Sequence, residues 1–154
     1  MNFADLISIE RVACGVTCNS KKRALEILSH LVCDNNDDIN QNEVFESLIA
    51  RERLGSTGLG KGIAIPHGRL KSGTQTIAAF IQLEEGVDFD APDGVAVDML
   101  CALMVPEVCS DEHLQVLAVL SEMFSDKTTR EKLRSAKEAK EIYEILTSQR
   151  ENNH

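Results

Sequence analysis

The chain has 154 residues, of which 43% are hydrophobic, with a formal net charge of −9 and a pI near 4.9. This length fits a single domain with its own core, and the acidity argues against nonspecific binding to nucleic acid or anionic lipid. No apolar run is long enough to span a bilayer, and the N-terminus lacks the order of a signal peptide. We therefore expect a cytoplasmic protein without direct membrane insertion.

Two helices are expected before residue 55. Ser20 is placed to cap a helix whose apolar stripe runs from 24 to 31. Asn40 and Glu43 have the spacing of a capping pair for a second helix, which Gly55 can end. The expected buried face of this second helix consists of Val44, Phe45, Leu48 and Ile49.

The middle of the chain reads as strands. A short strand is expected at 62–66, with pairing ended by Pro66, and 87–90 is expected to be a short edge strand. Residues 76–83 and 95–105 are too apolar for an edge, which predicts that both are central strands.

Helical patterns return after the last strand. Ser110 precedes a third helix, Ser125 or Asp126 is placed to start a short one, and Ser135 with Glu138 has the spacing of a capping box before a last helix. Residues 149–154 are polar and expected to be disordered. The whole pattern predicts one α/β domain, residues 1–148, with a mixed parallel and antiparallel sheet of about five strands and helices on both faces.

The five cysteines are odd in number and form no Cys-x-x-Cys pair, which favours a reducing compartment over a disulfide framework. Their spacing is too wide for a zinc site, and Cys33 and Cys101 lie in apolar patterns typical of core residues. We therefore expect neither a metal nor a cofactor.

A glycine and hydroxyl loop is the most informative segment. Gly55, Ser56, Thr57 and Gly58 offer backbone N–H groups and hydroxyls suited to phosphate. Residues 55–61 also match a P-loop pattern except at its last position, where Gly62 replaces the Ser or Thr that holds magnesium. The order here is helix, loop, strand, the reverse of a P-loop, so nucleotide binding is disfavoured.

One histidine follows this loop. His67 lies between Pro66 and Gly68, where an imidazole has little reason to serve as core packing and is suited to attack phosphorus with a neutral ring nitrogen. His113, in the first turn of a predicted helix, is placed to donate to a phosphoryl oxygen or to serve only as a cap or surface residue. Arg51 is expected to stabilise the phosphoryl group or contact a partner, and Arg69 is an alternative for that role.

These residues resemble a known family, the enzyme IIA proteins of the phosphoenolpyruvate-dependent phosphotransferase system, of the fructose and mannitol superfamily, and most of all its nitrogen-type branch. The resemblance is carried by residues 51–58 (RERLGSTG), 62–68 (GIAIPHG), 21–27 (KKRALEI), and 105–106 (VP) followed by 112–114 (EHL). It implies that His67 is phosphorylated, that His113 is a second active-site histidine, and that Arg51 lies near both. It also implies a doubly covered mixed sheet.

The resemblance implies partners as well. The donor would be a small histidine-phosphorylated carrier protein, and the targets would be potassium-transport proteins, sensor kinases or metabolic enzymes bound according to phosphorylation state. Nothing resembling a IIB or IIC domain follows within the 154 residues, which agrees with the nitrogen-type branch.

Three alternatives stay open at this level. One is a separate IIA subunit of a fructose- or mannitol-type sugar permease that passes phosphate to a IIB component. Another is a hydrolase with His67 as base and Ser56 or Thr57 as nucleophile, for which the sequence offers no placed acidic orienter. The third is a binding module whose glycine loop captures a small anion without transfer.

Overall fold

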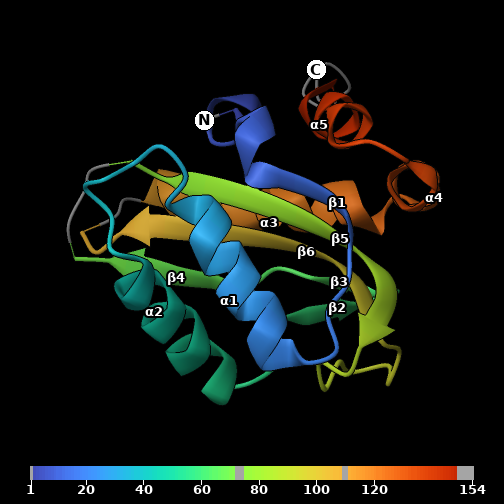
Figure 1. Cartoon of the computed structure of the whole chain (residues 1–154), viewed down its shortest axis with the longest axis horizontal. Helices are drawn as coiled ribbons and strands as arrows, with labels where there is room; N and C mark the ends of the chain where they lie inside the picture. The colour runs from blue at the N-terminus through green and yellow to red at the C-terminus, as the bar shows by residue number, and fades with distance from the viewer. Residues whose placement is uncertain (1, 72–74, 109–110, 149–154) are drawn as a thin grey trace.

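The computed structural model describes residues 2–71, 75–108 and 111–148, with 112–114 described only as part of a helix. Figure 1 shows the chain wound around one sheet. The elements in chain order are η1 (Phe3–Asp5), η2 (Ile9–Arg11), β1 (Val12–Val16), α1 (Lys21–Val32), α2 (Gln41–Arg53), β2 (Gly58–Gly60), β3 (Ile63–Ala64), β4 (His67–Leu70), β5 (Ile77–Val87), β6 (Val97–Pro106), α3 (Asp111–Ser125), α4 (Lys127–Ser135) and α5 (Ala139–Ser148).

Within the described residues the strands form one six-stranded sheet in the order β1-β5-β6-β3-β2, with β4 also paired to β6. β5 and β6 are antiparallel, whereas β1 runs parallel to β5 and both β3 and β4 run parallel to β6. This confirms the prediction of a mixed sheet of about five strands and the central place of the two apolar runs. The strand β1 was not predicted, and it pairs parallel with β5.

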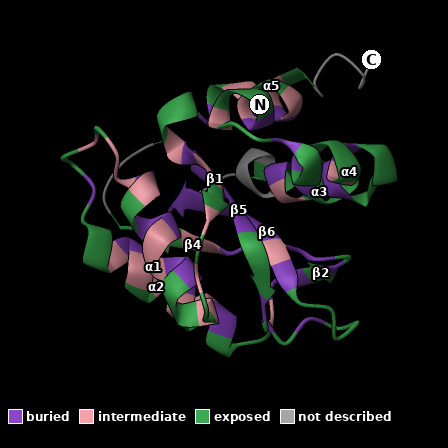
Figure 2. Cartoon of the chain, turned by 45° about the vertical axis from the view of Figure 1, so that its right-hand side comes forward, coloured by how far each residue is buried: buried purple, intermediate pink, exposed green. Residues whose placement is uncertain are grey.

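Helices cover both faces of the sheet, as predicted. Figure 2 shows α1 and α2 on one side of the sheet and α3, α4 and α5 on the other. Successive residues of β5 belong alternately to the cores on the two faces of the sheet. Ala78 and Phe80 pack with α3, α4 and α5, whereas Ala79 and Ile81 pack with α1 and α2. This alternation is the period of two that a strand imposes on its side chains.

The predicted helix starts are confirmed where their caps are described. The side chain of Ser20 accepts a hydrogen bond from the N–H of Arg23, and the side chain of Asn40 accepts one from the N–H of Glu43. Asp126 caps α4. The proposed cap at Ser110 and the tail 149–154 lie outside the described residues.

Other local predictions were wrong. Ser135 is the last residue of α4 and so cannot cap α5. Instead, the backbone carbonyl of Glu138 accepts from Ile142. Val87 ends β5, and no strand is formed by 88–90, where Asp90 has a positive φ of 54° that is incompatible with an extended edge.

The glycine segment is more regular than predicted. Gly58–Gly60 forms β2 and pairs antiparallel with β3, so part of the expected loop belongs to the sheet. Gly60 and Gly62 have φ values of 91° and 82°, which glycine adopts without strain, and they form the tight reversal between the two strands. The expected strand 62–66 is correspondingly short, since β3 spans only Ile63–Ala64.

Candidate functional site

His67 is the first residue of β4 rather than a residue beyond the end of a strand. The carbonyl of Pro66 accepts a hydrogen bond from Leu103, and pairing with β6 continues from His67 to Leu70. Proline lacks only the N–H donor, so its carbonyl can still bond to the neighbouring strand. The backbone of His67 is therefore held by the sheet, which limits where its ring can lie.

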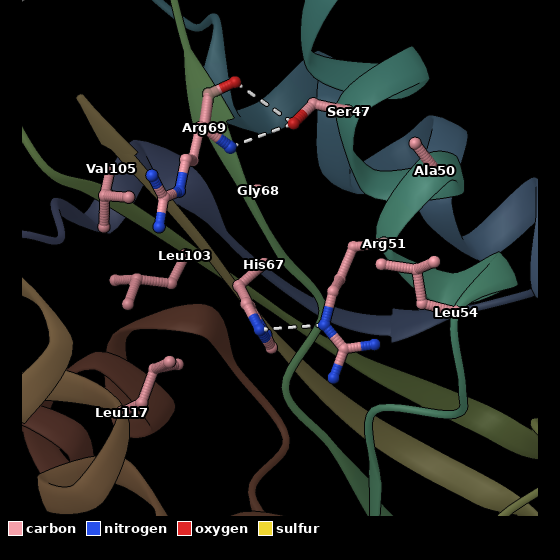
Figure 3. A pocket seen from close by; sticks show the side chains of 10 residues that line it. All are labelled: Ser47, Ala50, Arg51, Leu54, His67, Gly68, Arg69, Leu103, Val105 and Leu117. Carbon is pink, nitrogen blue, oxygen red and sulfur yellow. Dashed lines mark hydrogen bonds between the residues drawn. The ribbon is translucent and has the colours of Figure 1, made fainter. Parts of the chain in front are cut away.

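The imidazole has a defined hydrogen-bonding arrangement. Nδ1 lies 2.9 Å from the carbonyl oxygen of Ile65. A carbonyl oxygen only accepts, so Nδ1 carries the proton and Nε2 has the free lone pair. Nε2 lies 3.2 Å from Nε of Arg51, which donates to it. Nε2 is thus the unprotonated nitrogen, and Figure 3 shows it facing the guanidinium of Arg51.

The surroundings of His67 lower its pKa and so favour the uncharged ring. Burial lowers the pKa of His67 below its ordinary value, and the positive charge of Arg51 lowers it further. The hydrogen bond to Ile65 and the charge of Glu52 act in the opposite direction without reversing the shift. A lowered pKa favours the neutral imidazole, which is the form of histidine that can act as a nucleophile.

Arg51 lies in the last turn of α2 and is fixed at two points. Its Nε contacts His67, and its Nη1 donates to the carbonyl of Gly55 over 2.8 Å. Gly55 has a φ of 153°, in the region that favours glycine, and this conformation follows directly after the helix. The structure therefore brings Arg51 and His67 together, 16 positions apart in sequence.

Both residues line a pocket of about 460 Å³ with mostly apolar walls. Its lining residues are Ser47, Ala50, Arg51, Leu54, His67, Gly68, Arg69, Leu103, Val105 and Leu117. Figure 3 shows His67 between the apolar side chains of β6 and α3 on one side and Arg51 on the other. Leu54, at the rim, is 84% exposed. The unprotonated nitrogen of His67 therefore lies in a pocket with mostly apolar walls.

Ser47 was not singled out from the sequence, yet it fixes the strand that carries the histidine. Its hydroxyl donates to the carbonyl of Arg69 over 3.1 Å and accepts from the N–H of the same residue over 2.9 Å. This ties α2 to β4 beside Gly68 (Figure 3). No sequence signal marks a half-buried serine within a helix for this task. Leu103 and Val105 were predicted only as part of a central strand.

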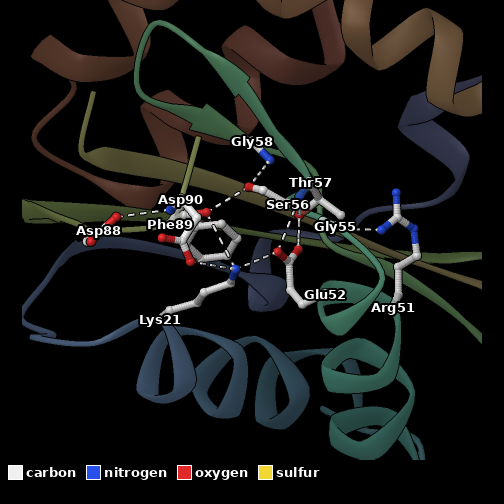
Figure 4. Close-up of polar contacts among 10 residues, drawn as sticks. All are labelled: Lys21, Arg51, Glu52, Gly55, Ser56, Thr57, Gly58, Asp88, Phe89 and Asp90. Carbon is white, nitrogen blue, oxygen red and sulfur yellow. Dashed lines mark hydrogen bonds and ion pairs between the residues drawn. The ribbon is translucent and has the colours of Figure 1, made fainter. Parts of the chain in front are cut away.

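The loop residues predicted to bind phosphate have protein partners. The hydroxyl of Ser56 donates to the carbonyl of Phe89 over 2.7 Å and accepts from the N–H of Gly58. Thr57 is buried, and both its N–H and its hydroxyl donate to the carboxylate of Glu52 (Figure 4). Neither residue lines the pocket of His67. The described contacts therefore give no support to these hydroxyls as phosphate ligands.

The remaining predicted groups are placed as follows. His113 lies in the first turn of α3, but its side chain is outside the described part of the chain, so its role stays a prediction. Leu117, further along the same helix, does line the pocket. Among the described residues no group of three or more His, Cys, Asp or Glu could hold a metal ion. No helix of the described residues is long and apolar enough to cross a membrane.

The described site consists of a histidine and an arginine that face each other in a pocket of a small α/β protein. Residues 5–149 match the family model described as phosphoenolpyruvate-dependent sugar phosphotransferase system, EIIA 2. The chain belongs to this family and is a component of the phosphotransferase system of the IIA type.

Similar proteins indicate to which branch of the family the chain is related. The chain is 44% identical to a nitrogen regulatory protein of Pseudomonas aeruginosa over 95% of each chain. It is 41% identical to one of Klebsiella oxytoca, over 99% of this chain and 94% of that one. The crystal structure of nitrogen regulatory protein IIA-Ntr from Neisseria meningitidis matches with a TM-score of 0.87 and 42% identity, covering 94% of this chain and 99% of that chain. The resemblance to the nitrogen-type branch is confirmed.

Proposed function

We propose that Nε2 of His67 accepts a phosphoryl group from a histidine-phosphorylated carrier protein, and that the phosphorylated and bare forms bind regulatory targets differently. The observation that carries the proposal is the orientation of one ring: Nδ1 donates to Ile65 while Nε2 points at Arg51 within an open pocket. A nucleophile needs an unprotonated nitrogen and a fixed direction, and this arrangement supports both.

The transfer step balances without a metal or a separate base. The N–P bond of the donor phosphohistidine breaks as the Nε2–P bond of His67 forms. The donor imidazole leaves with the electron pair of the broken N–P bond. His67 keeps its proton on Nδ1, where the proton is hydrogen-bonded to the carbonyl oxygen of Ile65. The phosphorylated ring then carries positive charge beside the negative phosphoryl oxygens, and no proton has to move during the step.

Arg51 supplies the charge that the transferring group needs. Before the reaction its Nε donates to the lone pair of Nε2 of His67, and this hydrogen bond must break before Nε2 can attack. The same guanidinium can then donate to the phosphoryl oxygens, with Gly55 still holding Nη1. His113 is proposed as a second donor to these oxygens. We assign no part in this step to Ser56 and Thr57, because their hydroxyls bond to Phe89 and Glu52.

The regulatory part of the proposal rests on charge. A phosphoryl group adds about two negative charges at this site. It would stand in an apolar pocket mouth that includes the exposed Leu54. Such a charge weakens the binding of a partner with an apolar contact surface. It strengthens the binding of a partner that places an arginine or lysine opposite the phosphoryl group. The relatives named nitrogen regulatory protein favour regulation over sugar transport for this chain.

We place the cycle in the cytoplasm. The cysteines within the described residues are free thiols, and free thiols fit a reducing compartment. The donor cascade from phosphoenolpyruvate, the target proteins and this chain would then share one compartment, with potassium-transport proteins, sensor kinases and metabolic enzymes as the classes of target to test first.

Intact-mass analysis with phosphoenolpyruvate, enzyme I and the carrier protein tests the nucleophile. The expected result is one acid-labile phosphate on the wild type and none on His67→Ala. His30→Ala is the matched control, because His30 is exposed, contacts Gln41 and does not line the pocket of His67. Stoichiometric phosphate on His67→Ala would refute the assignment. Affinity capture with both forms then tests whether phosphorylation changes the bound partners.

A further inference from the structure

Glu52 has a buried carboxylate next to the site but outside its pocket. Its side chain is 4% exposed and comes from the last turn of α2, directly after Arg51. Oε2 lies 2.8 Å from Nζ of Lys21 and 3.2 Å from the N–H of Thr57, and Oε1 accepts from the hydroxyl of Thr57. Figure 4 shows these groups converging on the turn that follows α2.

A buried carboxylate is costly unless it is paired and hydrogen-bonded. Here both requirements are met, because Lys21 supplies the opposite charge and Thr57 supplies two donors. Lys21 is itself held, with Nζ 4.7 Å from the ring centroid of Phe89 and 3.4 Å from its carbonyl oxygen. Satisfied polar networks of this kind are rigid. Thr57 is therefore fixed through its side chain and its N–H.

From Thr57 the backbone reaches the histidine. The carbonyl of Thr57 accepts the N–H of Ile65 over 3.1 Å. The carbonyl of the same Ile65 accepts from Nδ1 of His67. Ile65, whose carbonyl sets the direction of the imidazole, is thus bonded through its N–H to the residue that Glu52 holds.

The turn also reaches the arginine. Gly55 lies two residues before Thr57, and its carbonyl accepts Nη1 of Arg51 over 2.8 Å. Ser56, between them, is bonded to Phe89 and to Gly58 (Figure 4). A turn held on both sides in this way fixes the position of the Gly55 carbonyl. The turn at residues 55–57 is therefore bonded both to Arg51 and, through Ile65, to His67.

We propose that Glu52 and Thr57 form a positioning pair for phosphoryl transfer, which holds the Gly55 and Ile65 carbonyls and through them the guanidinium of Arg51 and the ring of His67. The inference rests on the proposed function. The pair acts through other residues, since neither Glu52 nor Thr57 lines the pocket that a donor would enter. It also gives Thr57, which was predicted to bind phosphate, a positioning task.

Three variants test the pair. Glu52→Gln removes the charge, Thr57→Val removes only the hydroxyl, and Thr57→Ser keeps the hydroxyl. Glu46→Gln is the matched control, because Glu46 is an exposed glutamate on the same helix and gives the same change of net charge. Transfer from the phosphorylated carrier is measured as the maximal rate and the donor concentration at half that rate.

We expect the maximal rate to fall about 10- to 100-fold in Glu52→Gln and Thr57→Val, which is the scale of a misplacement of about 1 Å at reacting groups. The half-saturating donor concentration should stay unchanged, because the docking surface is intact. Thr57→Ser and Glu46→Gln should transfer at the wild-type rate. The Nδ1 proton signal of His67 should weaken or shift in the two slow variants, reporting a changed bond to Ile65.

The outcomes separate the two proposals. If folded Thr57→Val and Glu52→Gln transfer at the wild-type rate, or if only the half-saturating concentration changes, the positioning pair is wrong while the phosphocarrier proposal stands. If the wild type accepts no phosphate, the proposed function itself fails. Circular dichroism identifies a variant that does not fold, and the isosteric Thr57→Val then decides the question.

Discussion

Replacing Arg51 by glutamine should slow phosphoryl transfer because it removes two hydrogen bonds at once, to Nε2 of His67 and to the carbonyl of Gly55. The Nε–H group of Arg51, which donates to His67 before the reaction, can donate to a phosphoryl oxygen during transfer. A hydrogen bond from a charged donor contributes about 1.5–3 kcal/mol. Each 1.36 kcal/mol in the barrier changes a rate about tenfold. The expected loss is therefore about 10- to 150-fold.

The assay is single-turnover transfer from the phosphorylated carrier, quenched at intervals and read by intact mass. Arg53→Gln is the control, since Arg53 is exposed, lies in the same last turn of α2 and carries the same charge. It reproduces the change of net charge without touching the pocket of His67. If Arg51→Gln stays within about twofold of Arg53→Gln, the guanidinium stabilises nothing in the transition state and the reasoning is refuted.

The same variant has a second signature in its pH dependence. The charge of Arg51 lowers the pKa of His67, so its removal should raise that pKa. Only the neutral ring attacks, and transfer falls as pH drops through the pKa of His67. The acid limb of the rate profile, followed from about pH 5 to about pH 9, should therefore move to higher pH in Arg51→Gln. A shift to lower pH would contradict the electrostatic assignment.

Stability offers three further tests. The folded state lowers the pKa of His67, so below about pH 6.5 the unfolded chain binds more protons than the folded one. The free energy of unfolding of the wild type should therefore fall as the pH drops from about 6.5 through the folded pKa. Urea titrations of His67→Gln should lack this fall, and the same slope in both proteins would disprove the coupling. Leu48→Ala, at a fully buried position, should lower the free energy of unfolding by about 2–5 kcal/mol, and a loss under about 1 kcal/mol would mean that the core closes over the gap. Gly62→Ala should lower it by at least about 1 kcal/mol, since φ is 82° and a Cβ would meet Arg134 and Asp98; a neutral effect in thermal melts would show that these side chains move aside at no cost.

Much of the scaffold was readable from local patterns. The helix starts at Ser20 and Asn40 follow from side chains that bond three residues ahead, so the information lies within one turn. The central place of β5 and β6 follows from their continuous apolar character. β1 escaped detection because its five residues are only partly buried and include a glycine. Ser135 misled because capping-box spacing also occurs where a helix ends.

The sequence by itself determined the helix phases, the two central strands and the candidate nucleophile, since each depends on neighbours along the chain. Only the tertiary structure decided which nitrogen of His67 is free, by placing Ile65 on one side of the ring and Arg51 on the other. It also gave Thr57 to Glu52 instead of to an anion. Hydrogen-bond donors choose partners by distance after folding, and spacing in the sequence does not encode which acceptor lies nearest.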